Sequence, residues 1–255
     1  MRVVKIGGRA QSDPRLATVI RYAWSAMPGQ LCIVHGGGDE MSAMQRALGR
    51  EAVFVGGRRV TSKGDLGVLR MVLSGVVNKR LVNTLVAAGL PAVGLSGEDA
   101  ALIGAELIDE SLLGFAGRPV GVNAELLRAL MRSRYLPVIS PVGYNASSAE
   151  GGALNVNGDD AAAAIAVGLG ADELLLVADV DGVRDSQGEV LSRLSTEAAH
   201  DLVTSGIANN GMAAKLEAAE TALISGVTRV RICSLAGFDN EEHGTFITQS
   251  QSVAL

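Results

Sequence analysis

Aromatic residues and basic runs are scarce in this chain of 255 residues, and each scarcity excludes a class of protein. Phe, Trp and Tyr make up only 3% of the residues, which argues against a surface on which nucleic-acid bases stack. The formal net charge is -5 and no basic stripe is present. We therefore expect neither nucleic acid nor an anionic membrane as a partner.

Cysteines are few and long apolar runs are missing. The chain has two cysteines, Cys32 and Cys233, which are too few for a disulfide framework. Both fall in predicted strands, where we expect buried, reduced thiols. No run of about 18 apolar residues occurs, and the N-terminus leads into a predicted strand rather than a signal peptide. The expectation is a soluble, cytoplasmic protein.

Common catalytic and metal-binding motifs are absent from the sequence. There is no G-x-x-x-x-G-K-[ST] phosphate loop, no H-E-x-x-H pair, no nucleophile elbow and no paired-cysteine motif. His200 and His243 lie far from His35 and form no ligand pattern with it. We therefore predict no metal site made by the protein alone.

Apolar residues and glycine are what the chain has in quantity. Apolar residues make up 48% of the sequence, enough for a sizeable core. Glycine accounts for 32 of 255 residues, about twice the usual share, without a collagen or linker period. The glycines therefore mark turns and close backbone approaches. This length suits one large α/β domain or two smaller lobes.

Strand and helix patterns alternate along the chain. Short β-branched and apolar runs predict strands at residues 2–6, 31–35, 92–95, 136–140, 173–178, 229–233 and 245–248, with a hairpin at 52–60. Helical periodicity predicts helices at residues 14–27, 39–48, 63–88, 123–133, 157–169, 197–205 and 212–225. This alternation predicts an α/β fold whose mostly parallel sheet is covered on both faces. We expect one compact domain with two lobes that divide near residues 150–153.

Some local features are also expected. Ser12 or Asp13 should cap the first helix, and the long helix at 63–88 should bend or break near Asn78. Residues 101–118 should form short strands and turns. The end of the chain, after Gln249, should fray.

Three glycine-bearing segments stand out: KIGGR at residues 5–9, VHGGG at 34–38 and GMAAK at 211–215. The first two follow predicted strands, so their glycines bring bare backbone N–H groups close to any anion bound there. A tight turn explains one such pair by itself. Two pairs at the carboxyl ends of strands favour a ligand site, because ligands of open α/β sheets bind at that edge.

Two lysines lie at opposite ends of the sequence. Lys5 belongs to an otherwise apolar strand, where its charge is costly unless it reaches an anion or water; an edge strand with a snorkelling side chain is the alternative. Lys215, in a helix, would by itself be an ordinary solvated lysine. Together they could neutralise one phosphoryl group from both sides, which suggests phosphoryl transfer. His35 is more simply a core or turn-stabilising residue than a catalytic one.

Three further segments each allow a functional and a simpler interpretation. In GRRVT, at 57–61, Arg58 or Arg59 could grip a carboxylate with two N–H groups, or both could be solvated. NVNGDD, at 155–160, has more polar groups than a helix cap needs, and Asp159 could pair with a lysine. DVDGV, at 179–183, suits either the hydroxyls of a ribose or a plain turn, and the sequence leaves both open.

The ordered set KIGG, VHGGG, GRRVT, NVNGD, ADVDGV and GMAAK resembles the amino-acid kinase family, most closely its N-acetylglutamate kinases of arginine biosynthesis. The resemblance spans nearly the whole chain. It implies a three-layer αβα sandwich with an open, mostly parallel central sheet. The lobe of residues 1–152 would bind the acyl substrate and most of a dimer partner, and the lobe of residues 153–255 would bind ATP.

The matched motifs imply roles for particular residues. Lys5 and Lys215 would flank the phosphoryl group, Asp159 would orient both lysines, and Gly8 and Gly37 would donate backbone N–H groups to the phosphates. The α-carboxylate of the substrate would be held by Arg59 and Asn155, in a site also lined by Gly37 and Gly38. The nucleotide would be lined by Asp179, Val180, Asp181, Gly182, Val183, Arg184, Ile207, Ala208 and Asn209.

The reaction implied by the resemblance is ATP-dependent phosphorylation of the γ-carboxylate of N-acetyl-L-glutamate to an acyl phosphate. A carboxylate is ionised at neutral pH, so no general base is required, and the chain offers no obvious one. Mg²⁺ would bridge the phosphates with few ligands from the protein. The chain lacks the N-terminal helix of hexameric, arginine-inhibited family members, so we expect a homodimer without strong arginine feedback.

Two positions depart from the family pattern and leave alternatives open. Gly158 and Asp160 stand where the familiar motif has Ala and Gln. With Gly158, the motif resembles that of related kinases of lysine biosynthesis, which phosphorylate aminoadipate or glutamate on a carrier protein. GRRVT instead favours free acetylglutamate. The motifs GRRVT and NVNGD fit poorly with the uridylate and carbamate kinases of the same superfamily.

Two other classes of protein are disfavoured. A nicotinamide-dependent oxidoreductase is disfavoured because KIGGR lacks the G-x-G-x-x-G spacing. A non-catalytic metabolite sensor is disfavoured because Lys5, Lys215 and Asp159 are all retained.

Overall fold

The computed structural model describes residues 1–238, 240 and 242–249. The predicted fraying after Gln249 lies outside the described residues. Cys32 and Cys233 are buried and unbonded, as predicted.

An eight-stranded sheet runs through the molecule in the order β12-β14-β13-β11-β1-β2-β8-β5. Neighbouring strands are parallel except β13 and β14, which are antiparallel. The mostly parallel sheet predicted from the sequence is therefore confirmed. Its strands are β1 (Arg2–Ile6), β2 (Leu31–His35), β5 (Ala92–Ser96), β8 (Leu136–Ser140), β11 (Glu173–Ala178), β12 (Arg193–Ser195), β13 (Arg229–Ser234) and β14 (Thr245–Thr248).

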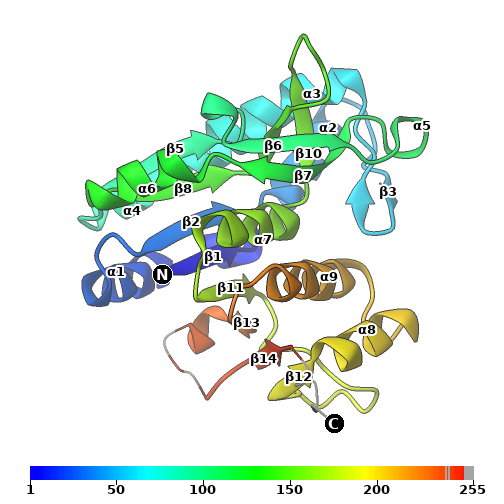
Figure 1. Cartoon of the computed structure of the whole chain (residues 1–255). Coiled ribbons are helices and arrows are strands. Elements are labelled where there is room, and N and C mark those ends of the chain that lie inside the picture. Colours follow the sequence, from blue (N-terminus) through cyan, green and yellow to red (C-terminus); the bar gives the residue numbers. More distant parts are fainter. Residues whose placement is uncertain (239, 241, 250–255) are drawn as a thin grey trace.

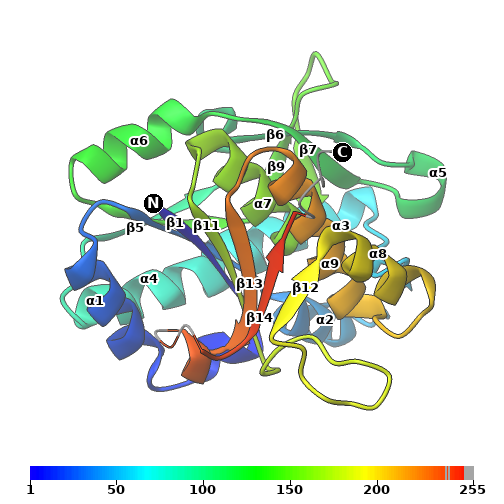
Figure 2. The same ribbon diagram turned by 60° about the horizontal axis from the view of Figure 1, so that its bottom comes forward.

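Helices cover both faces of this sheet, so the fold is a three-layer αβα sandwich (Figure 2). One face packs against α1 (Leu16–Ala26) and α4 (Asn78–Ala87), and the other against α6 (Ala124–Arg132), α7 (Gly158–Leu169) and α9 (Asn210–Ile224). Helix α8 (Thr196–Thr204) lies beside α9. The strand period of two explains the division: Val4 and Ile6 join the α1 and α4 side, whereas Val3 joins the α7 and α9 side. Lys5 has the same parity as Val3 and therefore points towards α7 and α9.

A second, smaller group of strands and helices lies beside the central sheet (Figure 1). Strands β6 (Ile103–Leu107), β7 (Ala116–Val122), β9 (Val142–Asn145) and β10 (Ala153–Val156) form a small closed sheet. The two-stranded hairpin of β3 (Phe54–Val55) and β4 (Arg58–Arg59) follows α2 (Gly38–Ala47). The short α5 (Glu110–Leu113) joins β6 to β7.

The structure changes some local predictions. Helix α1 begins at Leu16 with Arg15 as its N-cap, so Ser12 and Asp13 are not its cap. Asp13 instead accepts a 2.8 Å hydrogen bond from the backbone N–H of Arg15 and pairs with its guanidinium, after a 3₁₀ turn, η1 (Arg9–Ser12).

The long helix predicted at 63–88 is three consecutive segments. They are α3 (Lys63–Leu69), the π-helix η2 (Arg70–Val77) and α4, which begins at Asn78. The break expected near Asn78 is therefore a change of helix type. Strands β9 and β12 have three or four residues each and were not predicted, because such short runs carry little periodicity.

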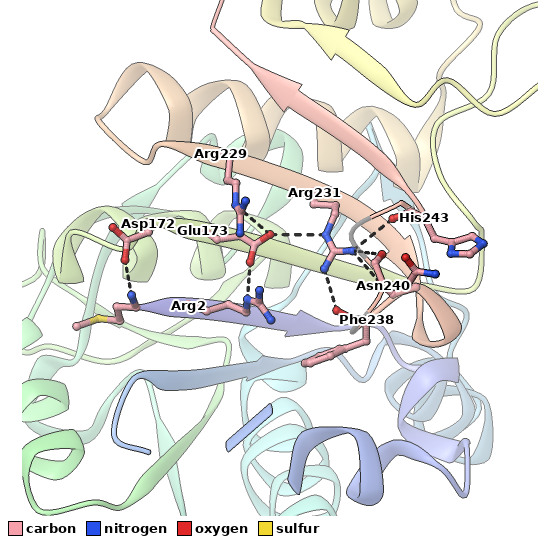
Figure 3. Close-up of polar contacts among 10 residues, drawn as sticks. Arg2, Asp172, Glu173, Arg229, Arg231, Phe238, Asn240 and His243 are labelled. Carbon is pink, nitrogen blue, oxygen red and sulfur yellow. Dashed lines mark hydrogen bonds and ion pairs between the residues drawn. The ribbon is translucent and has the colours of Figure 1, made fainter. Parts of the chain in front are cut away.

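A cluster of charged side chains joins the amino-terminal ends of three central strands (Figure 3). Glu173 on β11 is paired with Arg2 on β1, with Arg229 on β13 at 3.4 Å and with Arg231 on β13 at 3.6 Å. Arg231 is 1% exposed and also donates hydrogen bonds to backbone carbonyls between β13 and β14, including those of Gly237 at 2.7 Å and Phe238 at 2.8 Å. Glu173 and Arg2 lie at the amino ends of their strands, opposite the glycine loops, and Arg231 connects them to the segment that follows β13.

Candidate active site

The two glycine loops lie side by side at the carboxyl edge of the central sheet. Ile6 is in register with His35 on one side and with Val177 on the other. The N–H of Gly7 donates to the Val177 carbonyl at 2.9 Å, and the N–H of Gly36 donates to the Ile6 carbonyl at 2.9 Å. Adjacent parallel strands thus bring both loops to one place, as expected for a ligand site of an α/β sheet.

Two lysines from opposite ends of the sequence meet on one carboxylate in this place. The Nζ of Lys5 lies 2.9 Å from Oδ1 of Asp159, and the Nζ of Lys215 lies 3.3 Å from Oδ2. Lys5 is 7% exposed and Asp159 is 4% exposed. Two ammonium groups therefore share one negative charge in a largely dry environment, which suits a further anion between them.

The electrostatics of this triad follow from burial and proximity. Burial would raise the pKa of Asp159, but the charges of Lys5 and Lys215 outweigh it and hold that pKa below the usual value for an aspartate. The pKa of Lys215 is lowered, chiefly by burial and against the attraction of Asp159. Asp159 therefore stays ionised, as its role in holding both lysines requires.

Helix α7 places Asp159 through its own N-terminal cap. The Oδ1 of Asn157 accepts hydrogen bonds from the backbone N–H groups of Asp159, at 2.7 Å, and Asp160, at 3.4 Å. This is ordinary capping chemistry for asparagine. Gly158 leaves room beside Lys5, because a Cβ atom at this position would lie 3.3 Å from the Lys5 Cε.

A cavity of about 390 Å³ opens above the two glycine loops. Both lysines, Asp159 and the hairpin arginines line it, together with apolar side chains such as Phe54 and Leu73. This volume suits a small polar ligand with an apolar stem.

A second cavity, of about 280 Å³, adjoins the same lysines on the side of β11. It is lined by Lys5, Gly7, Gly8, Arg9, Ala10, Asp39, Ala178, Asp179 and Lys215. Arg9 donates to Asp179 at 2.6 Å and lies 3.9 Å from Asp39. The site therefore has two compartments that share the two lysines.

Arg59 is held deep in the larger cavity. Its guanidinium donates to Gln45 Oε1 at 2.5 Å, to the Gly38 carbonyl at 2.9 Å and to Ser42 Oγ at 2.8 Å. It also stacks on Phe54, with 4.6 Å between Cζ and the ring centroid. Arg59 is thus fixed against α2 next to the second glycine loop.

Asn155 lies on the same side of the larger cavity. The amide Nδ2 of Asn155 donates to Thr61 Oγ1 at 2.8 Å, and Asn155 lines the cavity together with Arg59, Gly37 and Gly38. The four residues predicted for a substrate carboxylate are therefore together in space.

The neighbouring Arg58 makes different contacts. It pairs with Asp160 on α7 and lies 3.9 Å from Glu217 on α9. Burial raises the pKa of Asp160, and the charge of Arg58 opposes that rise only in part.

His35 is part of the interior. It is fully buried, its Nδ1 lies 2.7 Å from the Gly36 carbonyl, and its Nε2 lies 3.1 Å from Asn78 Nδ2. Because the carbonyl can only accept, Nδ1 carries the proton and Nε2 accepts from Asn78. Burial lowers the pKa of His35 to about 4. It is a neutral core histidine that holds the glycine loop.

Of the residues predicted for the nucleotide, Asp179 lines the second cavity. Val183 and Ala208 are buried in the main apolar cluster, and Gly182 packs closely against Thr245. The remaining members have intermediate or exposed side chains, and these are Val180, Asp181, Arg184, Ile207 and Asn209. The buried members can reach a ligand only through their backbone.

Several lining residues escaped sequence reasoning. Arg9 follows the first glycine pair directly, and this position was the available signal for a third cation at the site. The apolar lining residues Met41, Leu69 and Ile108 carry no such signal, because they resemble any core residue in the sequence.

The described part of the chain lacks both a metal-binding cluster and a membrane-spanning helix. None of its His, Cys, Asp and Glu side chains gather in groups of three or more that could hold a metal ion. None of its helices is both long enough and apolar enough to span a membrane.

Known proteins have sequences similar to this chain over most of its length. A sequence model of the amino acid kinase family matches residues 1–234. An acetylglutamate kinase of Dinoroseobacter shibae is 42% identical over 228 residues, which cover 88% of this chain and 78% of that protein. An acetylglutamate kinase of Geobacillus sp. (strain WCH70) is 39% identical over 256 residues, covering 98% of each.

Solved structures agree with the fold. A protein of Streptococcus mutans superposes with a TM-score of 0.88 at 30% identity, covering 98% of both chains. An N-acetylglutamate synthase of Neisseria gonorrhoeae, solved with coenzyme A and N-acetyl-glutamate, gives 0.83 at 25% identity, covering 98% of this chain and 59% of that one. A carbamate kinase of Giardia lamblia, with 0.75 at 14% identity over 98% of both chains, shares the fold alone.

Proposed function

The chain belongs to the amino acid kinase family, and we propose that its two lysines carry out the family's phosphoryl transfer on N-acetyl-L-glutamate. The reaction is the ATP-dependent phosphorylation of the γ-carboxylate to an acyl phosphate, the second step of arginine biosynthesis. Relatives that are about 40% identical over most of the chain are acetylglutamate kinases. The observation that carries the mechanism is the pairing of Lys5 and Lys215 on Asp159.

The chemistry needs alignment and charge neutralisation rather than a base. An ionised γ-carboxylate attacks the γ-phosphorus of ATP, one P–O bond forms, and the bond to the ADP oxygen breaks. The negative charge on the transferring phosphoryl oxygens lies between the two ammonium groups. The backbone N–H groups of Gly8 and Gly37 direct the positive ends of their dipoles towards the same phosphate oxygens. Neutral His35 takes no proton in this scheme.

The two compartments divide the substrates between them. Arg59 and Asn155 hold the α-carboxylate of the acyl substrate in the larger cavity, beside Gly37 and Gly38. The nucleotide occupies the side of Asp179–Arg184 and Ile207–Asn209. The acyl lobe then comprises residues 1–152 and the nucleotide lobe residues 153–255, with strand β10, which pairs with β7 and β9, at their junction.

Mg²⁺ bound with the nucleotide would supply positive charge at the phosphates. Mg²⁺ usually keeps several waters and takes only one or two carboxylates from a protein. Asp39 and Asp179, which line the smaller cavity near Arg9, are the carboxylates that would hold it.

A homodimer is the assembly that follows from the family resemblance. The π-helix η2 carries two apolar side chains with large exposure, Met71 at 61% and Val76 at 55%. Such residues are available for contact with a second copy. Light scattering coupled to size exclusion tests this: we expect a dimer for the native chain and a monomer after Met71→Lys with Val76→Lys.

Hydroxamate trapping of the acyl phosphate tests the activity. Product should form with ATP, magnesium and N-acetyl-L-glutamate, but not with glutamate, N-acetylaminoadipate or no acceptor. Lys5→Ala and Lys215→Ala should each lower kcat by about 10² to 10³-fold, as expected for removing one preorganised charge donor. If no acyl phosphate forms with any free acid, the proposal is wrong and a carrier-bound acceptor is the next candidate. If turnover is unchanged in both variants, the two-lysine mechanism is wrong.

A further inference from the structure

The hairpin of β3 and β4 carries two adjacent arginines that attach to different parts of the molecule. Arg59 is bonded to α2 through Gln45 and Ser42. Arg58 pairs with Asp160, which lies 102 positions away at the start of α7. Both arginines line the larger cavity. The hairpin is thus anchored to the first lobe by one residue and to the second lobe by the next.

The partner of Arg58 is well shielded from water. The Asp160 side chain is 14% exposed and that of Arg58 is 26% exposed. The charged groups that face Asp160 are Arg58 from the hairpin, Asp159 from α7 and Glu217 from α9, and the two acids repel it. Because Asp160 is shielded from water and faces two other acids, its charge depends strongly on the pairing with Arg58.

The turn of the hairpin meets the second lobe at another point. A Cβ atom at Gly57 would lie 3.4 Å from the backbone carbonyl oxygen of Asn210. Asn210 is the first residue of α9, the helix that carries Lys215. The Arg58–Asp160 pair therefore lies between the residue that holds both lysines and the hairpin that borders the acyl compartment. Figure 1 shows β3 on the side of the molecule where α9 begins.

We propose that Arg58 and Asp160 form a positioning pair that fixes the hairpin against the second lobe and so sets the place of the acyl substrate relative to the lysines. This inference rests on the proposed function for its kinetic consequences. Neither residue needs to touch the phosphoryl group. Arg58 acts through the backbone it shares with Arg59, and Asp160 acts as the anchor on α7. Asp160 stands where the familiar family motif has Gln, so the anchor is a charge in this chain.

Steady-state kinetics of single and double variants test the pair. Asp160→Asn and Arg58→Gln should each raise the KM for N-acetyl-L-glutamate about tenfold, because a loosened hairpin misplaces the acyl substrate. The KM for MgATP should stay within about twofold. The double variant should be no worse than the poorer single variant, because both changes remove one contact. Multiplying effects, or an unchanged KM in both single variants, would overturn the proposal.

A more exposed ion pair that stays within the first lobe supplies the control. Glu106 on β6 pairs with Arg118 on the neighbouring β7. Glu106→Gln also removes the carboxylate of an arginine pair, but one that does not join the hairpin to α7, and should leave both KM values unchanged. Asp160→Glu, which keeps the charge, should recover most of the loss seen in Asp160→Asn.

Hydrogen exchange of the ligand-free protein tests the pair independently of catalysis. Amides of residues 53–60 should exchange several-fold faster in Arg58→Gln than in the native chain, while those of α7 stay protected. Arg58 is the more exposed partner, so its variant should fold even if an Asp160 variant does not. Unchanged exchange in the hairpin would contradict the pair. If the native chain makes no acyl phosphate but the hairpin of Arg58→Gln still exchanges faster, the proposed function is wrong and the positioning role of the pair is supported.

Discussion

At the scale of single residues, the site depends on charges that would be unfavourable alone. Lys5 and Asp159 are almost completely buried, and a buried charge is tolerated only when it is paired. Lys5 could be suspected from the sequence, because it interrupts an apolar strand. Lys215 has the sequence context of an ordinary solvated lysine on a helix, and only the family motif GMAAK singled it out; in the structure its contact with Asp159 distinguishes it.

The lowered pKa of Lys215 predicts an alkaline limit to activity. Its charge is present below its pKa and is lost as the pH rises through that value, which burial places below that of an exposed lysine. We therefore expect kcat/KM, which reports the free enzyme, to fall at a lower pH than solvated lysines titrate. Lys215→Arg should be slower at neutral pH, by about 10²-fold from misplacement, and should lack this fall. An identical alkaline limb in both proteins would contradict the assignment.

At the scale of elements, α4 approaches the sheet closely because β5 has a glycine at its centre. A Cβ atom at Gly94 would lie 2.1 Å from Oδ1 of Asn78, the first residue of α4. Asn78 is fully buried and donates to the Val138 carbonyl at 2.9 Å, next to His35. The contact between α4 and β5 therefore supports the histidine that holds the second glycine loop.

A single methyl group should disturb this contact. Gly94→Ala should lower the free energy of unfolding by about 1–3 kcal/mol through overpacking, measured by chemical denaturation. Gly67→Ala is the matched control, because Gly67 lies inside α3 with no heavy atom within 4 Å of the added Cβ. It should be neutral or stabilise by up to about 1 kcal/mol. Equal effects of the two substitutions would contradict this account.

At the scale of the whole molecule, one continuous sheet carries both compartments of the site. The edge opposite the glycine loops is held by Glu173 with arginines from β1 and β13 (Figure 3). Arg231 extends this cluster to the segment between β13 and β14. The cluster joins the starts of β1 and β11, and those strands lead directly into Gly7 and Asp179 at the site.

Removing the acid should therefore weaken the fold rather than the chemistry. Glu173→Gln leaves buried guanidinium groups without their carboxylate, which should cost about 3–5 kcal/mol of stability. Glu106→Gln breaks an exposed pair and should cost less than about 1 kcal/mol. Thermal or chemical unfolding measures both, and kcat of folded Glu173→Gln should match the native value. A small loss of stability with a large loss of turnover would refute the structural role.

The sequence by itself determined the alternation of strands and helices, the parallel sheet and the position of the glycine loops. These features follow from periodicity and from the fact that each glycine loop directly follows its strand in the sequence, and both are local properties. The same local rules missed the N-cap at Arg15, the strands β9 and β12 and the π-helix η2, where short runs or tertiary packing outweigh propensity.

Only the tertiary structure decided which charges meet. Residues 5, 159 and 215 come together because β1 lies in the middle of the sheet and α7 and α9 cover the face to which Lys5 points. By spacing alone either Arg58 or Arg59 could hold a carboxylate, and the family motif implied Arg59. Packing separates the two, because Arg59 turns to α2 and Arg58 turns to Asp160. Distances between residues far apart in the chain depend on the whole fold, and no local pattern encodes them.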